Sequence, residues 1–265
     1  MILCADDYGL SHDIDRAILD LCRLGRLTAV SCMVALERCN AQLLQELLVF
    51  EKKVDVGLHL CLTDENLPLS SSHGPHGTTP ARPFPSFGVL LRRALQGKVR
   101  RSEVKLEVSR QYDLFREKCG SAPSFVDGHL HVHQLPGVRD GLLDFVLSLP
   151  TASRPYIRNT RMPVRELRGG GLPWLKTSLI GAFGNRMFKQ LQQVGLATNE
   201  GFAGIYDFAD WRKYSEFLPR FAGALQRPNG MLVVHPGNKE DWRRKEFTAL
   251  REFAFPNGFL NNFRK

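Results

Sequence analysis

Short apolar runs alternate with amphipathic stretches along most of the chain. Residues 1–5 form a short apolar run of the kind that predicts a buried strand, and the apolar residues between 14 and 24 recur on one face of a helix that ends at Gly25. This order repeats along the sequence, and it is typical of a mostly parallel sheet covered by helices. The pattern therefore predicts an α/β fold.

The same reading gives the expected elements in chain order. Strands are expected at 1–5, 28–36, 54–61, 124–132, 155–157, 202–206 and 231–234. Helices are expected at 11–24, 40–50, 102–119, 138–148, 174–193, 211–225 and 241–253. Residues 160–200 have the least regular pattern and contain the glycine run 169–171.

The alternation is interrupted once, at residues 63–85. This segment is rich in Pro, Ser, Gly and His, which favours a functional surface loop over another strand and helix. The sequence has no internal repeat and no segment typical of a linker. We therefore expect a single domain over residues 1–265 that carries this long loop as an insertion.

Charge and cysteine usage narrow the class of protein. The 36 Lys and Arg exceed the 27 Asp and Glu, but the basic clusters at 98–101 and 243–245 have no interleaved aromatic residues. Solvated helix faces explain them better than a nucleic-acid groove. None of the six cysteines forms a CxxC pair, and no apolar run could span a bilayer. We expect a cytoplasmic protein with no nucleic-acid partner and no transmembrane segment.

Carboxylate and imidazole groups gather where the expected strands end. In a parallel α/β fold these ends meet at one edge of the sheet, where reactive groups collect. The residues that follow or close these strands are Asp6, Asp7, His59, Asp127, His129, His131, His133 and His235.

This assortment indicates a divalent metal site. A catalytic metal typically has three protein ligands and one open position for water, and one aspartate with two histidines would satisfy that requirement. In the stretch DGHLHVH, alternation along an extended strand would direct His129, His131 and His133 to one side.

Each feature taken alone also has a structural explanation. His59 in its apolar strand could be a hydrogen-bonded core residue, and the Asp6-Asp7 pair could form a turn and cap the first helix. The repeated histidines could belong to a histidine-rich loop. The combination of all three features, each at a strand end, favours the metal site.

Four sequence blocks resemble the YdjC-like family of carbohydrate deacetylases. They are ADDYGLS at 5–11, VGLHLCLTD at 56–64, DGHLHVHQLPGV at 127–138 and VVHPG at 233–237, in the order found in that family. The resemblance implies an irregular (β/α) barrel of the TIM type that removes acetyl groups from N-acetylated sugars of the N-acetylglucosamine type, whether free, oligomeric or lipid-linked.

The resemblance also implies roles for residues of the matching blocks. Asp7, His59 and His129 would bind one divalent metal ion, Zn²⁺ or Mg²⁺. Asp6 would be the catalytic base and His235 the acid. On this interpretation the cation offsets the repulsion between the adjacent carboxylates.

Substrate contacts follow from the same resemblance. His131 and His133 would line the pocket, and Arg158 would hold a sugar or an anionic group. Trp174 and Trp211 could stack on a pyranose or pack in the shell of the barrel. A homodimer is compatible with the resemblance.

Two other functions remain open at this point. One is a metal-dependent phosphoesterase or amidohydrolase that uses His129 and His131 as an HxH ligand pair. The other is a carbohydrate-binding relative without catalytic activity. Release of acetate from an acetylated sugar would separate both from a deacetylase.

Overall fold

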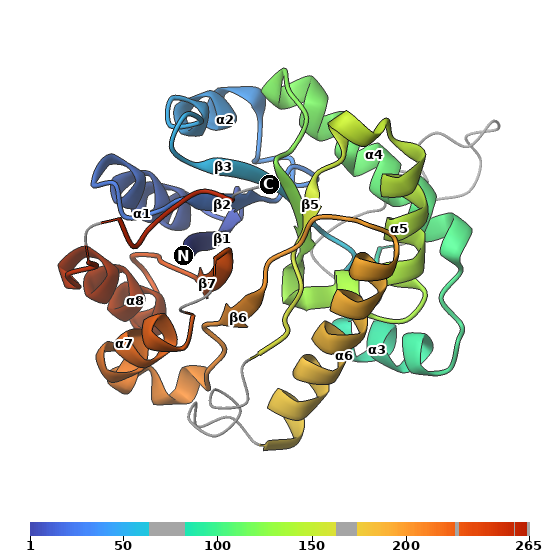
Figure 1. The fold of residues 1–265 in the computed structure, drawn as a ribbon. Helices are drawn as coiled ribbons and strands as arrows, with labels where there is room; N and C mark the ends of the chain where they lie inside the picture. Colours follow the sequence, from blue (N-terminus) through green and yellow to red (C-terminus); the bar gives the residue numbers. More distant parts are fainter. Residues whose placement is uncertain (64–82, 163–173, 226–227, 257, 264–265) are drawn as a thin grey trace.

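A parallel sheet forms the centre of the molecule in the computed structural model, which describes residues 1–63, 83–162, 174–225, 228–256 and 258–263 (Figure 1). The sheet has seven strands in the order β5-β4-β3-β2-β1-β7-β6, and each neighbouring pair is parallel. The strands are β1 (Ile2–Tyr8), β2 (Ala29–Cys32), β3 (Asp55–Leu60), β4 (Phe125–Gly128), β5 (Tyr156–Ile157), β6 (Gly201–Ala203) and β7 (Gly230–Val234).

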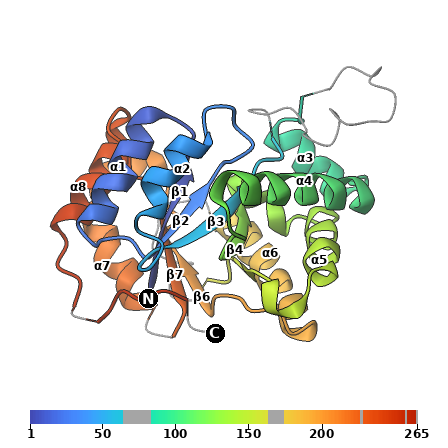
Figure 2. The same cartoon turned by 90° about the horizontal axis from the view of Figure 1, so that it is seen from above.

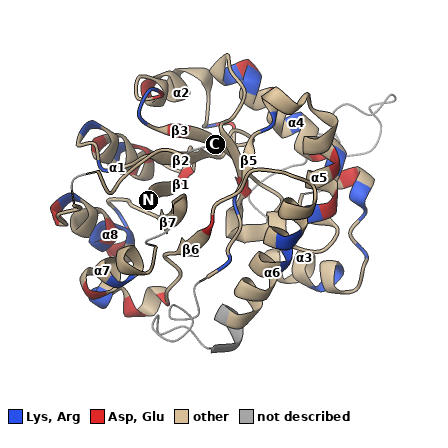
Figure 3. Cartoon of the chain, in the orientation of Figure 1, with Lys and Arg blue, Asp and Glu red and all other residues tan. Residues whose placement is uncertain are grey.

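Helices cover the outer side of this sheet (Figures 1 and 2). They are α1 (His12–Arg23), α2 (Ala41–Leu48), α3 (Phe87–Leu95), α4 (Arg101–Cys119), α5 (Val138–Ser148), α6 (Trp174–Gln193), α7 (Tyr214–Ala224) and α8 (Asp241–Glu252). None of the described helices combines the length and the apolar character needed to cross a membrane. Lys and Arg are interspersed with Asp and Glu over these helices (Figure 3).

The sheet curls, and its two edges approach each other. An isolated parallel bridge joins Ile157 of β5 to Thr198, three residues before β6, and the Ile157 amide donates to the Ala197 carbonyl at 2.9 Å. The Asn159 amide donates to the side chain of Asn199 at 2.8 Å. The curled parallel sheet confirms the expected barrel-like α/β fold. A closed barrel of the TIM type stays a prediction.

The alternation of side chains along each strand separates two cores. Leu3 and Ala5 of β1 pack in the large core between the sheet and its helices, whereas Ile2 and Cys4 belong to a smaller apolar cluster on the inner side of the curl. The other buried members of this inner cluster are Ala29, Phe125, Tyr156 and Met231. Asp6 continues the inward series of β1, so the strand itself directs this carboxylate towards the interior.

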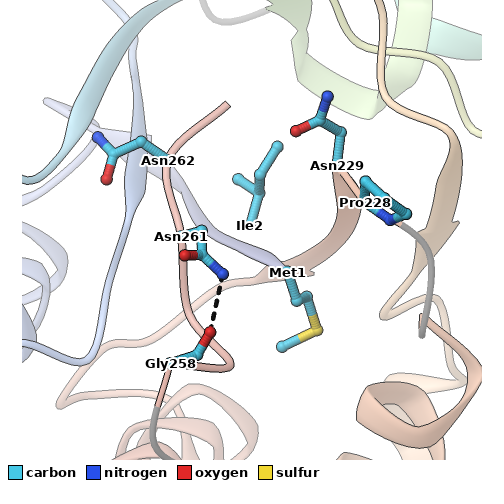
Figure 4. A pocket seen from close by; sticks show the side chains of 7 residues that line it. All are labelled: Met1, Ile2, Pro228, Asn229, Gly258, Asn261 and Asn262. Carbon is cyan, nitrogen blue, oxygen red and sulfur yellow. Dashed lines mark hydrogen bonds between the residues drawn. The ribbon is translucent and has the colours of Figure 1, made fainter. Parts of the chain in front are cut away.

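The end of the described chain covers the amino-terminal end of the sheet. The ring of Phe263 stacks on Tyr156 with centroids 4.1 Å apart, and the Asn261 amide donates to the Met1 carbonyl at 2.9 Å. A cavity of about 240 Å³ lies beside them, lined by Met1, Ile2, Pro228, Asn229, Gly258, Asn261 and Asn262 (Figure 4). This cavity lies at the opposite end of the sheet from the carboxyl ends of the strands.

The helix predictions for α4, α5, α6 and α8 agree with the structure to within one residue at each end. Four strand predictions were wrong at their carboxyl ends, and one of them, β6, was expected to reach residue 206 but ends at Ala203. Strand β1 runs on to Tyr8 and includes both aspartates, and β2 stops at Cys32. Strand β4 stops at Gly128, where a 3-10 helix, η2 (His129–Gln134), begins. Of the expected loop 63–85, residues 64–82 lie outside the described part of the chain.

Candidate active site

The two adjacent aspartates sit on an irregularity of β1. The register between β1 and β2 shifts between Ala5 and Tyr8, and Asp7 has a φ of 72°, a conformation that residues other than glycine rarely adopt. Asp6 and Asp7 are each only 2% exposed. The bulge turns both side chains into the site from successive positions and gives each its own set of partners.

Asp6 is paired with a fully buried arginine. Arg158 Nη1 donates to Asp6 Oδ2 at 2.7 Å and Nη2 donates to Oδ1 at 2.6 Å. The same guanidinium forms an ion pair with Asp127 and lies 3.1 Å from Cys4 Sγ. Burial alone would raise the pKa of Asp6, but the charge and hydrogen bonds of Arg158 lower it far below its usual range. Asp6 is therefore ionised.

Asp7 faces two imidazoles and a second arginine. His129 Nδ1 lies 3.2 Å from Asp7 Oδ1, and His59 Nε2 lies 3.6 Å from the same oxygen. Arg243 Nη2 donates to Asp7 Oδ2 at 2.7 Å. Burial again opposes ionisation, but the hydrogen bond from His129 and the charge of Arg243 lower the pKa of Asp7 well below its usual range.

The orientation of His59 is set from behind by the neighbouring strands. The register of β3 and β4 pairs His59 with Asp127, and His59 Nδ1 lies 2.6 Å from Asp127 Oδ1. With Nδ1 donating to the Asp127 carboxyl group, the lone pair of Nε2 lies on the side of His59 that faces the Asp7 carboxyl group. Ser31 of β2 donates to the same Asp127 oxygen at 2.6 Å. This arrangement is common behind histidines that bind a metal.

Asp7, His59 and His129 fit a divalent cation. Their donor atoms all lie within 4.8 Å of one another, and the rings of His59 and His129 are 5.6 Å apart. Metal–ligand bonds of about 2.1 Å place neighbouring donors about 3.0–3.4 Å apart, close to the observed distances from Asp7 Oδ1. Cys4, Asp6 and Asp127 also converge, but the Arg158 guanidinium already contacts all three.

His235 follows β7 and lies on the other side of Asp6. The register pairs Ala5 of β1 with Val234, so the next residue of each strand reaches the same level of the sheet. His235 Nε2 is 4.0 Å from Asp6 Oδ2. Burial lowers the pKa of His235 to about 4, although Asp7 and Asp6 act in the opposite direction. The imidazole is therefore neutral at pH 7.

A buried carboxyl group anchors the backbone of His235. The His235 amide donates to Glu246 Oε2 at 2.6 Å, and the Tyr206 hydroxyl donates to Glu246 Oε1 at 2.7 Å. Glu246 is 1% exposed, and burial raises its pKa to about 7. The pair fixes the point at which the chain turns out of β7.

The residues expected to contact substrate lie differently from the prediction. Arg158 has no exposed surface and is committed to Asp6 and Asp127, so the expected clamp on a sugar is replaced by an internal ion pair. His133 is also fully buried, and its Nε2 donates to the Arg158 carbonyl at 3.0 Å. Both side chains are buried behind the site, where Arg158 holds Asp6 and His133 holds the backbone of Arg158.

The three histidines of DGHLHVH do not share one side, because β4 ends before them. Leu130 and His131 have φ values of 53° and 58°, and this left-handed step separates the imidazoles. His129 reaches Asp7, whereas His131 meets the ring of Phe202 edge-on at 5.5 Å. Burial and the charge of Arg158 lower the pKa of His131 well below its usual value, so this imidazole is neutral. The alternation argument was therefore wrong for this segment.

Four residues of the site were not assigned a role from the sequence. Arg243 belongs to a basic cluster that the sequence favours as a solvated face, yet it is 7% exposed and bound to Asp7. Asp127 precedes the histidines and could have been found by pairing the two strands in register. The sequence carries no comparable signal for Ser31 or Glu246.

Comparisons with known proteins identify the family of the chain. Residues 1–258 match the family model described as YdjC-like protein. A carbohydrate deacetylase of Mus musculus is 31% identical over 259 residues, which cover 89% of this chain and 77% of that protein. A chitooligosaccharide deacetylase of Escherichia fergusonii is 31% identical over 144 residues, 52% of each chain.

Other relatives are matched over part of their length. A human carbohydrate deacetylase is 32% identical over 187 residues, and the match spans 66% of this chain and 52% of that protein. Among solved structures, an Enterococcus faecalis V583 protein named for cellobiose-phosphate cleavage superposes with a TM-score of 0.65. That match covers 95% of this chain and 90% of the other at 18% identity, and it supports the fold alone.

Proposed function

Because the chain belongs to the YdjC-like family, we propose that it is a metal-dependent hydrolase that removes the acetyl group from an N-acetylated sugar. The observation that carries this proposal is the convergence of Asp7, His59 and His129 beside a second carboxylate, Asp6, and a partly exposed imidazole, His235. The names of the relatives, carbohydrate deacetylase and chitooligosaccharide deacetylase, support a sugar amide as the substrate.

Asp7, His59 and His129 would hold the cation. A bound divalent metal supplies a Lewis acid that polarises the amide carbonyl and makes a coordinated water more acidic. Asp127 and Ser31 keep the proton of His59 on Nδ1, so that its Nε2 can serve as a ligand. The donor set of one carboxylate and two imidazoles suits zinc, and the proposal leaves magnesium as the alternative to be tested.

Asp6 and His235 would transfer a proton from water to the departing sugar nitrogen. Asp6 stays ionised in its pair with Arg158, and as a carboxylate it would accept a proton from water. His235 is neutral at pH 7, so the proton that it donates to the departing sugar nitrogen has to reach it during turnover. Its Nε2 lies 4.0 Å from Asp6 Oδ2, close enough for a small movement to pass the proton between them.

The alternative based on an HxH ligand pair loses support from the geometry. Among the residues that the structure describes, His131 is in neither cluster of metal-binding groups, and its ring packs against Phe202. A phosphoesterase of this type would need His129 and His131 on one ion. A binding relative without catalytic activity is separated from a deacetylase by the assay below.

The proposal is tested by metal content and acetate release on the same preparations. The full chain, loaded with zinc or magnesium, should release acetate from N-acetylglucosamine or its β-1,4-linked dimer. Asp6→Asn should keep the metal and lose turnover, whereas His59→Ala should lose both. His12→Ala, an exposed histidine on α1, is the matched control and should change neither.

Two results would contradict the proposal. Acetate release that survives complete removal of metal would exclude the role given to Asp7, His59 and His129. Release of phosphate from a sugar phosphate, without any acetate from acetylated sugars, would favour the phosphoesterase instead. A reversed pattern, with metal lost in Asp6→Asn and retained in His59→Ala, would overturn the individual roles.

A further inference from the structure

Phe208 is an exposed aromatic residue at the edge of the candidate active site. Phe208 is 42% exposed, and every other Phe, Tyr or Trp whose side chain the structure describes is buried or partly buried. It begins the 3-10 helix η5 (Phe208–Lys213), which follows β6, the strand beside β7. The rings of Phe208 and His235 meet edge to face with centroids 5.8 Å apart.

The ring of Phe208 is held in place by its neighbours. It packs on Trp242 of α8 with centroids 4.2 Å apart, and it meets Tyr206 edge-on at 5.1 Å. Asp207 caps the start of η5 by accepting from the Ala209 amide at 3.0 Å. The ring is therefore fixed on two sides and leaves its remaining surface to solvent.

This aromatic pair is also connected to the metal-binding group. The Arg243 guanidinium lies 4.4 Å from the centroid of Trp242, and the same guanidinium donates to Asp7. Phe208, Trp242 and Arg243 thus form a continuous stack from the exposed rim to a proposed metal ligand. An isolated exposed phenylalanine is ordinary, but one built into such a stack is preorganised to bind an apolar surface.

We propose that Phe208 is a platform for the pyranose ring that carries the acetylated amine. This inference rests on the proposed function, because the nitrogen that leaves must come within about 3 Å of His235. The ring carbon bonded to that nitrogen then lies within reach of Phe208. A pyranose has an apolar face of C–H groups, which stack well on an aromatic ring. Phe208 would thereby determine the preference for sugars over other acetamides.

Binding of the β-1,4-linked dimer of N-acetylglucosamine tests this role by calorimetry on the metal-loaded full chain. Phe208→Ala should weaken binding about tenfold, which corresponds to about 1.4 kcal/mol. Phe208→Tyr keeps the aromatic face and should bind within about twofold of the unmodified protein. Metal content should be unchanged in both variants, because the ring of Phe208 packs against Tyr206, His235 and Trp242 and not against the proposed metal ligands.

The control uses another tryptophan–arginine pair, which lies in η5 together with Phe208. The Arg212 guanidinium lies 4.5 Å from the centroid of Trp211, and Trp211 packs against the large core. Trp211→Phe should lower stability slightly and leave sugar affinity unchanged. If Phe208→Ala lowers stability while sugar affinity stays at the unmodified value, the aromatic stack only fastens η5 to α8 and the platform is excluded.

The outcomes distinguish this inference from the proposed function. Sugar binding that depends on Phe208, without acetate release by the unmodified protein, would retain the platform and refute the deacetylase. Acetate release with equal kcat/KM in the unmodified protein and in Phe208→Ala would retain the deacetylase and refute the platform. Failure of the unmodified protein to bind the sugar would refute both.

Discussion

Replacing Arg158 by methionine should destabilise the folded protein by about 3–5 kcal/mol at pH 7. The guanidinium is fully buried and neutralises two buried carboxylates, since it bonds both oxygens of Asp6 and also pairs with Asp127. Methionine has a similar length but no charge, so the variant leaves these buried carboxylates without a counter-charge.

The destabilisation has an upper limit, because a buried carboxylate that has lost its counter-charge can take up a proton and become neutral. With an ordinary pKa of about 3.9, protonation costs about 4 kcal/mol at pH 7 but only about 1.5 kcal/mol at pH 5. The destabilisation by Arg158→Met should therefore shrink by about 2–3 kcal/mol between pH 7 and pH 5. An additional Asp6→Asn substitution should recover part of the loss at pH 7.

Urea denaturation of the metal-free protein, kept in chelator, measures these differences. Arg101→Met is the control, because Arg101 pairs with Asp144 on the surface with its side chain 60% exposed. That variant should lose at most about 1 kcal/mol. The reasoning is refuted if Arg158→Met loses less than about 1 kcal/mol at pH 7, or if its loss is the same at pH 5 and pH 7.

Four further outcomes are expected. Asp127→Asn should weaken metal binding about 10- to 100-fold in a chelator competition, because Asp127 orients His59. Burial raises the pKa of the Glu246 carboxyl group to about 7 from its ordinary 4.5. Between these pH values the unfolded chain loses this proton while the folded protein keeps it, so the free energy of unfolding falls as the pH rises. Urea midpoints at pH 5 and pH 8 should show this loss, about 3 kcal/mol, and Glu246→Gln should abolish it. Gly57→Ala should destabilise by about 1–3 kcal/mol, because the new Cβ would lie 2.4 Å from the Phe125 ring; a neutral urea midpoint would contradict this. Removal of the metal by chelator should abolish acetate release yet leave the far-UV circular dichroism unchanged, and an unfolded apoprotein would exclude this interpretation.

The sequence predicted those features that depend on local periodicity. Helix α4 was predicted within one residue, because its apolar positions recur regularly and Gly120 ends it in a left-handed conformation with a φ of 74°. The positions of Asp7, His59 and His129 at one end of the sheet followed from the rule that parallel strands present their carboxyl ends together. The structure brings these three residues to one point.

The features that could not be predicted depend on contacts distant in sequence. Arg158 and Asp6 are 152 positions apart, and Arg243 and Asp7 are 236 positions apart. Neither arginine lies in a pattern that distinguishes a buried guanidinium from an exposed one. The left-handed step at Leu130 and His131 was also missed, because strand periodicity was extended across a point where the backbone leaves the sheet.

These buried arginines change the explanation of the aspartate pair. The sequence indicated that a cation keeps the adjacent carboxylates together, yet each already has its own guanidinium in the protein. Asp6, Asp7 and Asp127 face Arg158 and Arg243, so three carboxyl groups lie against two guanidinium groups. A divalent cation bound by Asp7, His59 and His129 would add two positive charges beside these groups. Under the proposed function, the excess of carboxylates would favour binding of a cation, and the bound cation would stabilise negative charge on the attacked carbonyl oxygen.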